Sequence, residues 1–263
     1  MTRIVVVLIG AVFVAYFAFL VSIAIAKEQT SIWDRLDLTI GLGAEIEPDY
    51  TGSNDYEVEA EPILRAVYDD RFYIGFLEIG YYWHLRDDLT LQLGVEYEEG
   101  RERDDNDVLR DLDEIDDDAE FVAALRYDID RWQFGVQLQQ YTGRSDKGTV
   151  GFIAARYTYP FGDRLTLTPK ADISFASGRH MRTEFGISQA EANRSGFRAY
   201  DPDGGFKSAT GGLELSFDIS DRWQFRAEAE VEYYGDEAAD SPLIDDFGSR
   251  VTYEAGAAIV YRF

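Results

Sequence analysis

Apolar and polar residues alternate with a period of two along most of the chain. In residues 222–234 the odd positions are apolar (Trp223, Phe225, Ala227, Ala229, Val231, Tyr233) and the even positions are polar (Gln224, Arg226, Glu228, Glu230, Glu232). The same alternation recurs in residues 89–97, 121–129, 165–175 and 213–219. This period indicates β-strands with two unlike faces, and no comparable helical period competes with it. The sequence therefore predicts an all-β fold.

Strand length separates two all-β architectures. Strands of a soluble sandwich have about five or six residues, whereas a tilted strand that crosses an outer membrane needs about nine to eleven. The alternating segments here run ten to fourteen residues. Short polar connections (69–70, 128–131, 162–163, 220–222) alternate with long polar loops (100–118, 178–205, 235–248). Short turns at one rim and long loops at the other predict a closed antiparallel transmembrane β-barrel.

The alternating segments predict twelve strands. They lie near residues 35–47, 56–68, 71–77, 78–85, 89–99, 119–129, 131–142, 149–160, 163–176, 206–219, 222–234 and 250–263. The outward-facing set changes parity between Phe76 and Leu77, which either a tight turn or a bulge would produce. One continuous strand there would give eleven, an odd count that single-chain bacterial barrels disfavour. A ten-stranded barrel, with part of 71–85 in a loop, is the alternative.

The four tryptophans share a position relative to the short turns. Trp33, Trp132 and Trp223 each open a predicted strand beside one, and Trp83 closes a strand before another. An indole ring is apolar while its N–H needs a polar partner, so an interfacial girdle at one rim explains this placement. Core residues of a soluble protein would have no reason to lie at one rim.

The polar face of the strands predicts a charged barrel interior. It carries Asp37, Glu45, Glu59, Glu61, Arg65, Glu96, Arg126, Asp128, Arg156, Lys170, Asp172, Asp218, Arg226, Glu228, Glu230, Glu232, Glu254 and Arg262. Both signs occur, with acids in excess. These groups form either a network that fills the lumen or the lining of a narrow cation-preferring channel. A barrel of ten or twelve strands lies between closed eight-stranded and open sixteen-stranded barrels, which favours a filled or very narrow lumen.

The N-terminus predicts export. Arg3 is followed by an apolar or small stretch from Ile4 to Ala26, and Ala24 and Ala26 form an A-x-A site before polar sequence. This pattern is typical of a cleaved signal peptide, residues 1–26, although the stretch is long enough for a retained anchor. The barrel is then expected to comprise residues 27–263.

The composition argues against most kinds of binding and catalytic site. The net charge of −25 opposes binding to nucleic acid, and with no cysteine and only His84 and His180 a thiolate or multi-histidine metal site is not expected. Ser177 and His180, with Ser174 nearby, lack an orienting carboxylate and read as polar loop residues. The acidic stretch 104–118 lacks the spacing of a calcium loop and reads as a solvated charge run. We therefore predict no catalytic, cofactor or metal site.

Several separated motifs carry a family resemblance. They are residues 48–53 (PDYTGS) with Tyr56–Val58, residues 109–111 with 115–116, residues 185–190, 194–196 and 199–201, residues 235–236 with 239–242, and the final residues 261–263 (YRF). Together they cover almost the whole expected mature chain, which resembles the MipA/OmpV family (MltA-interacting protein family) of outer-membrane barrels. One departure is the segment 98–120, where thirteen residues are acidic and three basic.

The resemblance implies a location and a role. It places the chain in the outer membrane of a Gram-negative bacterium, in contact with lipid and lipopolysaccharide, and the final aromatic residue resembles the signal read by the barrel assembly machinery. Proteins similar to this are scaffolds that link a periplasmic lytic transglycosylase to a penicillin-binding protein in cell-wall remodelling. The expected function is therefore that of a scaffold or interaction protein, not an enzyme. A narrow cation-preferring outer-membrane channel is the alternative.

Overall fold

A computed structural model describes residues 32–142 and 147–263. The expected signal peptide, residues 1–26, lies outside the described residues. A 3-10 helix, η1 (Trp33–Arg35), directly precedes the first strand. None of the helices in the described part of the chain is long and apolar enough to cross a membrane.

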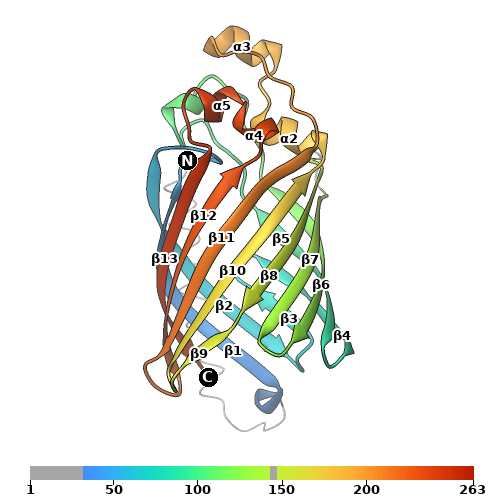
Figure 1. Cartoon of the computed structure of the whole chain (residues 1–263), viewed down its shortest axis with the longest axis vertical. Helices are drawn as coiled ribbons and strands as arrows, with labels where there is room; N and C mark the ends of the chain where they lie inside the picture. The colour runs from blue at the N-terminus through green and yellow to red at the C-terminus, as the bar shows by residue number, and fades with distance from the viewer. Residues whose placement is uncertain (1–31, 143–146) are drawn as a thin grey trace. The chain divides into compact units, whose positions relative to one another are not determined.

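The strands form one antiparallel sheet that closes on itself (Figure 1). Pairing of β10 with β11 closes the ring, and β13 pairs with β1. Both β8 and β9 pair with β10, so these two segments form one wall strand and the barrel has twelve. The segments are β1 (Leu36–Pro48), β2 (Tyr56–Tyr68), β3 (Phe72–Gly75), β4 (Glu78–Arg86), β5 (Leu89–Glu98), β6 (Asp118–Ile129), β7 (Trp132–Tyr141), β8 (Thr149–Tyr157), β9 (Tyr159–Phe161), β10 (Leu165–Ala176), β11 (Gly205–Asp218), β12 (Trp223–Tyr234) and β13 (Val251–Arg262).

The twelve-strand prediction is confirmed at its weakest point. The change of facing between Phe76 and Leu77 is a tight turn, because β3 and β4 pair as antiparallel strands with Ile74 opposite Ile79. The backbone N–H of Tyr97 donates to the carbonyl of Leu77 at 2.9 Å, which ties this turn to β5. The ten-strand alternative is therefore wrong for the barrel as a whole.

Burial along the strands is the inverse of that in a soluble protein. Leu42, Val136 and Ile153 are 50–62% exposed on the outer face, whereas Glu120 and Gln92 are 2% and 4% exposed on the inner face. An apolar outer face lowers the free energy only when it contacts lipid. The predicted orientation of the two strand faces is thus confirmed.

The two ends of the barrel differ as the loop lengths predict. Short turns and the C-terminal residue lie at one end, and long connections lie at the other (Figure 1). The long connections contain helices that the sequence analysis treated as loops: η2 (Asp107–Leu109), α2 (Gly178–Phe185), α3 (Gln189–Ser195), α4 (Asp236–Ala239) and α5 (Pro242–Asp245). One local signal was available, because Ser188 and Glu191 have the spacing of a capping box and form one before α3.

Candidate functional site

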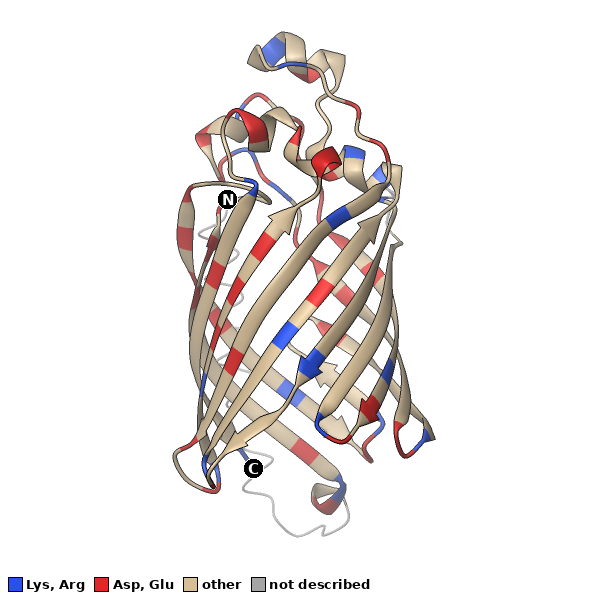
Figure 2. Cartoon of the chain, viewed as in Figure 1, with Lys and Arg blue, Asp and Glu red and all other residues tan. Residues whose placement is uncertain are grey.

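The short turns form a charged surface that we call the turn rim, comprising residues 69–71, 86–88, 130–131, 163–164 and 221–222. Each of these five turns carries at least one aspartate and one arginine, so both signs gather at this end (Figure 2). Asp69, Asp70 and Asp130 have φ angles of 57°, 54° and 54°, as tight turns require. Most of these side chains are exposed. The rim is therefore open to a polar partner.

Tryptophans border the turn rim on the lipid-facing side. Trp83, Trp132 and Trp223 are 58%, 46% and 47% exposed and lie within a few residues of a short turn. Trp132 contacts Tyr157 with ring centroids 4.9 Å apart, and Trp223 contacts Tyr261 at 5.0 Å. The predicted girdle is confirmed for these three tryptophans. Trp33 lies in η1, before the barrel.

Ion pairs run along the luminal wall between neighbouring strands. The Lys170 Nζ atom lies 3.6 Å from Glu214 Oε1 and 3.1 Å from Glu228 Oε2, and it also pairs with Glu230. Arg156 pairs with Glu214. These groups come from β8, β10, β11 and β12, so one lysine and one arginine neutralise carboxylates from two adjoining strands.

Three glutamates lie side by side on the inner face of β4, β5 and β6. Glu78 is directly opposite Glu96, and Glu96 is directly opposite Glu120. We call these residues the glutamate row. Gln139 Nε2 donates to Glu120 Oε1 at 2.7 Å, whereas the buried Oε2 atom has no hydrogen-bond partner among the described residues. Like charges at directly paired positions repel, so this row favours a bound cation or proton.

Aromatic and cationic side chains fill part of the lumen below the glutamate row. Tyr73 and Tyr82 stack with centroids 4.6 Å apart, and Arg65 Nη2 donates to the Tyr82 hydroxyl at 3.0 Å. Arg126 lies over the same ring at 5.6 Å. A cavity of about 250 Å³ remains along β6, β7, β8 and β10, with Gln137 and Ala154 in its lining. These side chains occupy part of the lumen, and a filled or very narrow lumen stays a prediction.

Two apolar clusters cover the opposite end of the barrel, and together we call them the outer cap. One cluster joins α2, α4 and α5 to the strand ends: Val150, Ala176, Met181, Phe185, Tyr234, Ala238, Ala239 and Ile244. The other joins the loops: Tyr50, Leu109, Leu112, Ile187 and Leu243. Met181, Phe185, Ala238 and Leu243 are fully buried. The sequence analysis did not find this cap, since its residues come from segments far apart in the chain.

Polar contacts fix the loops of the outer cap. The Tyr50 hydroxyl donates to the carbonyl of Leu243 at 3.1 Å, and Ser241 Oγ donates to the carbonyl of Phe185 at 2.7 Å. Burial raises the pKa of Glu191, but hydrogen bonds from Ser188 and from the Asp113 backbone lower it by more, so the net pKa lies below its usual value. A cavity of about 620 Å³ lies beside α3, between residues 113–116 and 199–201. It is lined by groups of both charges.

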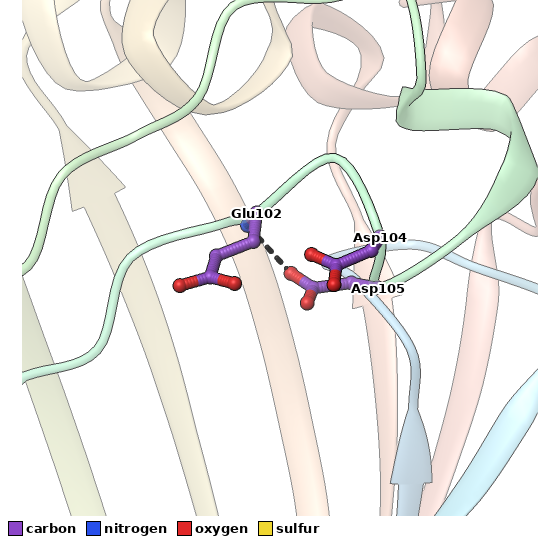
Figure 3. Close-up of side chains that lie close together, drawn as sticks. All are labelled: Glu102, Asp104 and Asp105. Atoms are coloured by element: carbon purple, nitrogen blue, oxygen red, sulfur yellow. Dashed lines mark hydrogen bonds between the residues drawn. The ribbon is translucent and has the colours of Figure 1, made fainter. Parts of the chain in front are cut away.

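The acidic loop brings three carboxylates together (Figure 3). The Glu102 backbone N–H donates to Asp105 Oδ2 at 2.7 Å, and the carboxylate oxygens of Glu102, Asp104 and Asp105 lie within 4.8 Å of one another. All three side chains are exposed, so water can solvate the charges without a metal. The absence of a metal site stays a prediction.

Ser177 and His180, the candidate nucleophile and base of a hydrolase, make other contacts in the structure. Ser177 caps α2, and its Oγ accepts the backbone N–H of Thr149 at 3.0 Å and that of His180 at 3.4 Å. The His180 ring stacks on Tyr141, and neither ring nitrogen makes a hydrogen bond within the described part of the chain. Ser174 Oγ bonds Ser208 Oγ at 2.8 Å. The structure therefore does not bring Ser177 Oγ and the His180 imidazole together as nucleophile and base.

Comparisons with known proteins agree with the barrel. The family described as "MltA-interacting protein MipA" matches residues 40–263. The chain is 28% identical over 221 residues to the MltA-interacting protein of Escherichia coli K12, covering 80% of this chain and 84% of that protein. It is 25% identical over 214 residues to the putative outer membrane protein YiaT of the same strain, covering 80% and 85%.

Solved structures similar to the chain are outer-membrane barrels. The NanC porin aligns with a TM-score of 0.47 and 10% identity over 86% of this chain and 100% of that chain. The COG4313 outer membrane channel of Pseudomonas putida F1 aligns with a TM-score of 0.45 and 13% identity, over 86% of this chain and 96% of that one.

Proposed function

The chain belongs to the MltA-interacting protein (MipA) family and is an outer-membrane β-barrel, and on this premise we propose that it is a scaffold for murein enzymes. Its proposed partners are a periplasmic lytic transglycosylase and a penicillin-binding protein. The observation that carries the proposal is the family match over residues 40–263, which includes all but the first four residues of the described barrel strands. We propose no catalytic role for the barrel itself.

The turn rim is the proposed docking surface. Short turns of outer-membrane barrels face the periplasm, where murein enzymes work. Exposed rim charges steer encounter and set the orientation of a partner more than they add affinity. Since every turn of the rim carries both signs, the expected partner surface is polar and carries both signs as well.

Binding to a purified lytic transglycosylase of the same bacterium tests the proposal. We expect the detergent-solubilised barrel to bind the enzyme, and the rim variant Arg71→Gln/Arg131→Gln/Arg164→Gln to bind about tenfold more weakly, because three rim charges are removed. Surface plasmon resonance with immobilised barrel measures both affinities.

The matched control changes the same number of arginines in the long connections at the opposite end of the barrel, as Arg182→Gln/Arg194→Gln/Arg198→Gln. This variant should retain wild-type affinity, since these residues lie at the opposite end of the barrel. Absence of binding by the wild-type barrel would contradict the scaffold function, and equal weakening by both variants would contradict docking at the turn rim.

A second candidate function is a narrow cation-preferring channel. The observation that favours it is the excess of carboxylates on the inner face of the strands, because walls of one charge sign concentrate counter-ions. Single-channel recording on the refolded barrel tests it. We expect small conductance steps and a reversal potential that reports cation selectivity; no conductance would contradict the channel.

A further inference from the structure

The outer cap obstructs one end of the barrel, so the barrel wall is the other place where a route into the lumen can open. Its apolar clusters cover the end of the barrel opposite the turn rim, where an axial entrance would open. Buried apolar side chains cannot replace the hydration of a charge, so these clusters oppose the passage of ions where they lie.

The wall of hydrogen-bonded strands is interrupted between β2 and β5. β3 is only four residues long and pairs with residues 65–68 of β2. In the described part of the chain, no strand pairs with residues 56–64 on the side that faces β3. Both faces of Tyr56–Ala60 are exposed, unlike the inner face of neighbouring strands. We call this interruption the wall gap.

Named residues mark the lower edge, the upper edge and the two sides of the wall gap. Its lower edge is the turn at Phe76 and Leu77, which bonds Tyr97. At its upper edge Asn106 Nδ2 donates to Asp49 Oδ2 at 2.8 Å and lies 3.4 Å from Asp55 Oδ2. Tyr97 is 43% exposed on the β5 side, and Tyr56 on β2 is 40% exposed, with its hydroxyl accepting the backbone N–H of Tyr253 of β13 at 3.2 Å. Interfacial tyrosines lie at the level of lipid headgroups, so the upper part of the gap meets a hydrated layer.

Carboxylates line both sides of the wall gap. Glu57 and Glu59 face it from β2, and Glu99 and Asp105 face it from the loop after β5. Burial, and after it the carboxylate of Glu59, raises the pKa of Glu99, which reflects the approach of the two sides. Arg101 is a cation near Asp105, but its guanidinium is also engaged elsewhere. Its Nη1 donates to the backbone carbonyl of Glu184 at 2.8 Å.

The acidic lining continues inward at the lower edge of the gap. Glu78 is the first residue of β4 after the turn, and it opens the glutamate row that leads to Glu120. Glu120 is only 2% exposed and lies directly opposite Glu96, so these two carboxyl groups take up a proton or a cation between them. Carboxylates therefore lie both at the sides of the gap and on the luminal face below it.

We propose that the wall gap is a lateral entrance through which small hydrophilic cations reach the lumen beneath the outer cap. This inference rests on the second candidate function and is independent of murein-enzyme binding. The entrance admits cations because its two sides and its floor carry carboxylates, and it excludes anions for the same reason.

Thiol labelling tests the entrance, because the chain contains no cysteine and one introduced thiol is the only one present. Gln137→Cys places it in the luminal cavity. Two methanethiosulfonate reagents of similar size, one with a trimethylammonium group and one with a sulfonate, then react with the folded protein in detergent. Arg126, Arg156 and Lys170 also line this cavity and act equally in every variant, so the readout is the ratio of the cationic to the anionic rate, compared with the same ratio after the gap is neutralised.

Charge-neutral variants in the Gln137→Cys background locate the route. Glu57→Gln/Glu59→Gln/Glu99→Gln should lower the ratio of cationic to anionic rates several-fold, whereas Asp70→Asn/Asp87→Asn/Asp88→Asn on the turn rim, with the same charge change, should not. Heat-modifiable electrophoretic mobility confirms that each variant is folded. An unreactive thiol, an unchanged ratio in the gap variant, or an equal fall in the rim variant would overturn the lateral entrance. Conductance that persists alongside any of these results would leave the channel itself intact.

Discussion

His180 is a buried base of α2, beside the apolar cluster that this helix forms with the strand ends. Its side chain is 3% exposed, and its ring centroid lies 5.7 Å from that of Tyr141. Burial lowers the pKa of His180 to about 4, and Glu184 opposes this shift only in part. The imidazole is therefore neutral in the folded cap at pH values where the same histidine in an unfolded loop would begin to take up a proton.

We predict that the cap loses stability as the pH falls. Between about pH 6.5 and pH 4 the unfolded segment binds a proton that the folded cap excludes, so unfolding is favoured by up to about 3 kcal/mol; above pH 6.5 the effect vanishes. Hydrogen exchange of α2 amides, corrected for the intrinsic rate, measures this stability. His180→Phe retains an aromatic ring beside Tyr141 and should show no such pH dependence. An equal loss of protection in that variant would assign the effect to other groups.

The β3–β4 hairpin pairs with β2 and β5, and the Tyr73 side chain lies across Gly80 and Gly94 at this junction. A Cβ atom at Gly80 would lie 2.4 Å from the carbonyl oxygen of Leu93 and 2.5 Å from the Tyr73 hydroxyl. That hydroxyl also accepts a hydrogen bond of 2.7 Å from Gln92 Nε2. Glycine at position 80 thus lets Tyr73 approach the strand closely, and this contact stabilises the short hairpin below the wall gap.

Gly80→Ala is expected to destabilise the barrel by about 1–3 kcal/mol, because the added methyl group overlaps both a backbone oxygen and the Tyr73 ring. Gly151→Ala is the matched control, since the nearest atom to its Cβ would be 3.8 Å away. Urea unfolding of both variants in phospholipid vesicles compares them. A control variant as unstable as Gly80→Ala would mean that glycine itself, and not the Tyr73 contact, matters in these strands.

At the scale of the whole molecule, the barrel presents its apolar residues outward and its charges inward. This arrangement is stable only where lipid surrounds the strands, since water would leave the outer face unfavourably hydrated. Residues 136 and 137 lie next to each other on β7 and face opposite sides, and Val136 is 50% exposed while Gln137 lines the lumen.

The outer surface predicts a strong asymmetry between these two neighbours. Val136→Arg should lower the stability of the membrane-embedded barrel by about 2–4 kcal/mol, whereas Gln137→Glu should have little effect because Arg126, Arg156 and Lys170 line the same luminal cavity. Equilibrium unfolding from lipid vesicles gives both values. Equal costs at the two positions would show that the outer face does not contact hydrocarbon.

The sequence alone predicted the barrel and the facing of its strands, and it favoured twelve strands over ten, which the β3–β4 pairing then confirmed. Alternation with a period of two is a local property, because successive side chains of a strand point to opposite faces whatever the strand pairs with. The parity change between Phe76 and Leu77 even located the shortest hairpin. The turn rim and its tryptophans followed for the same reason, since each lies within a few residues of a turn.

Only the tertiary structure decided the outer cap and the wall gap. Leu109, Ile187 and Leu243 meet in the cap although the chain separates them widely, and no local pattern encodes such a contact. The gap exists because β2 extends nine residues, 56–64, beyond the part that pairs with β3. The sequence of one strand does not specify where the neighbouring strand ends. Pairing register and ring closure set both features, and they are properties of the whole sheet.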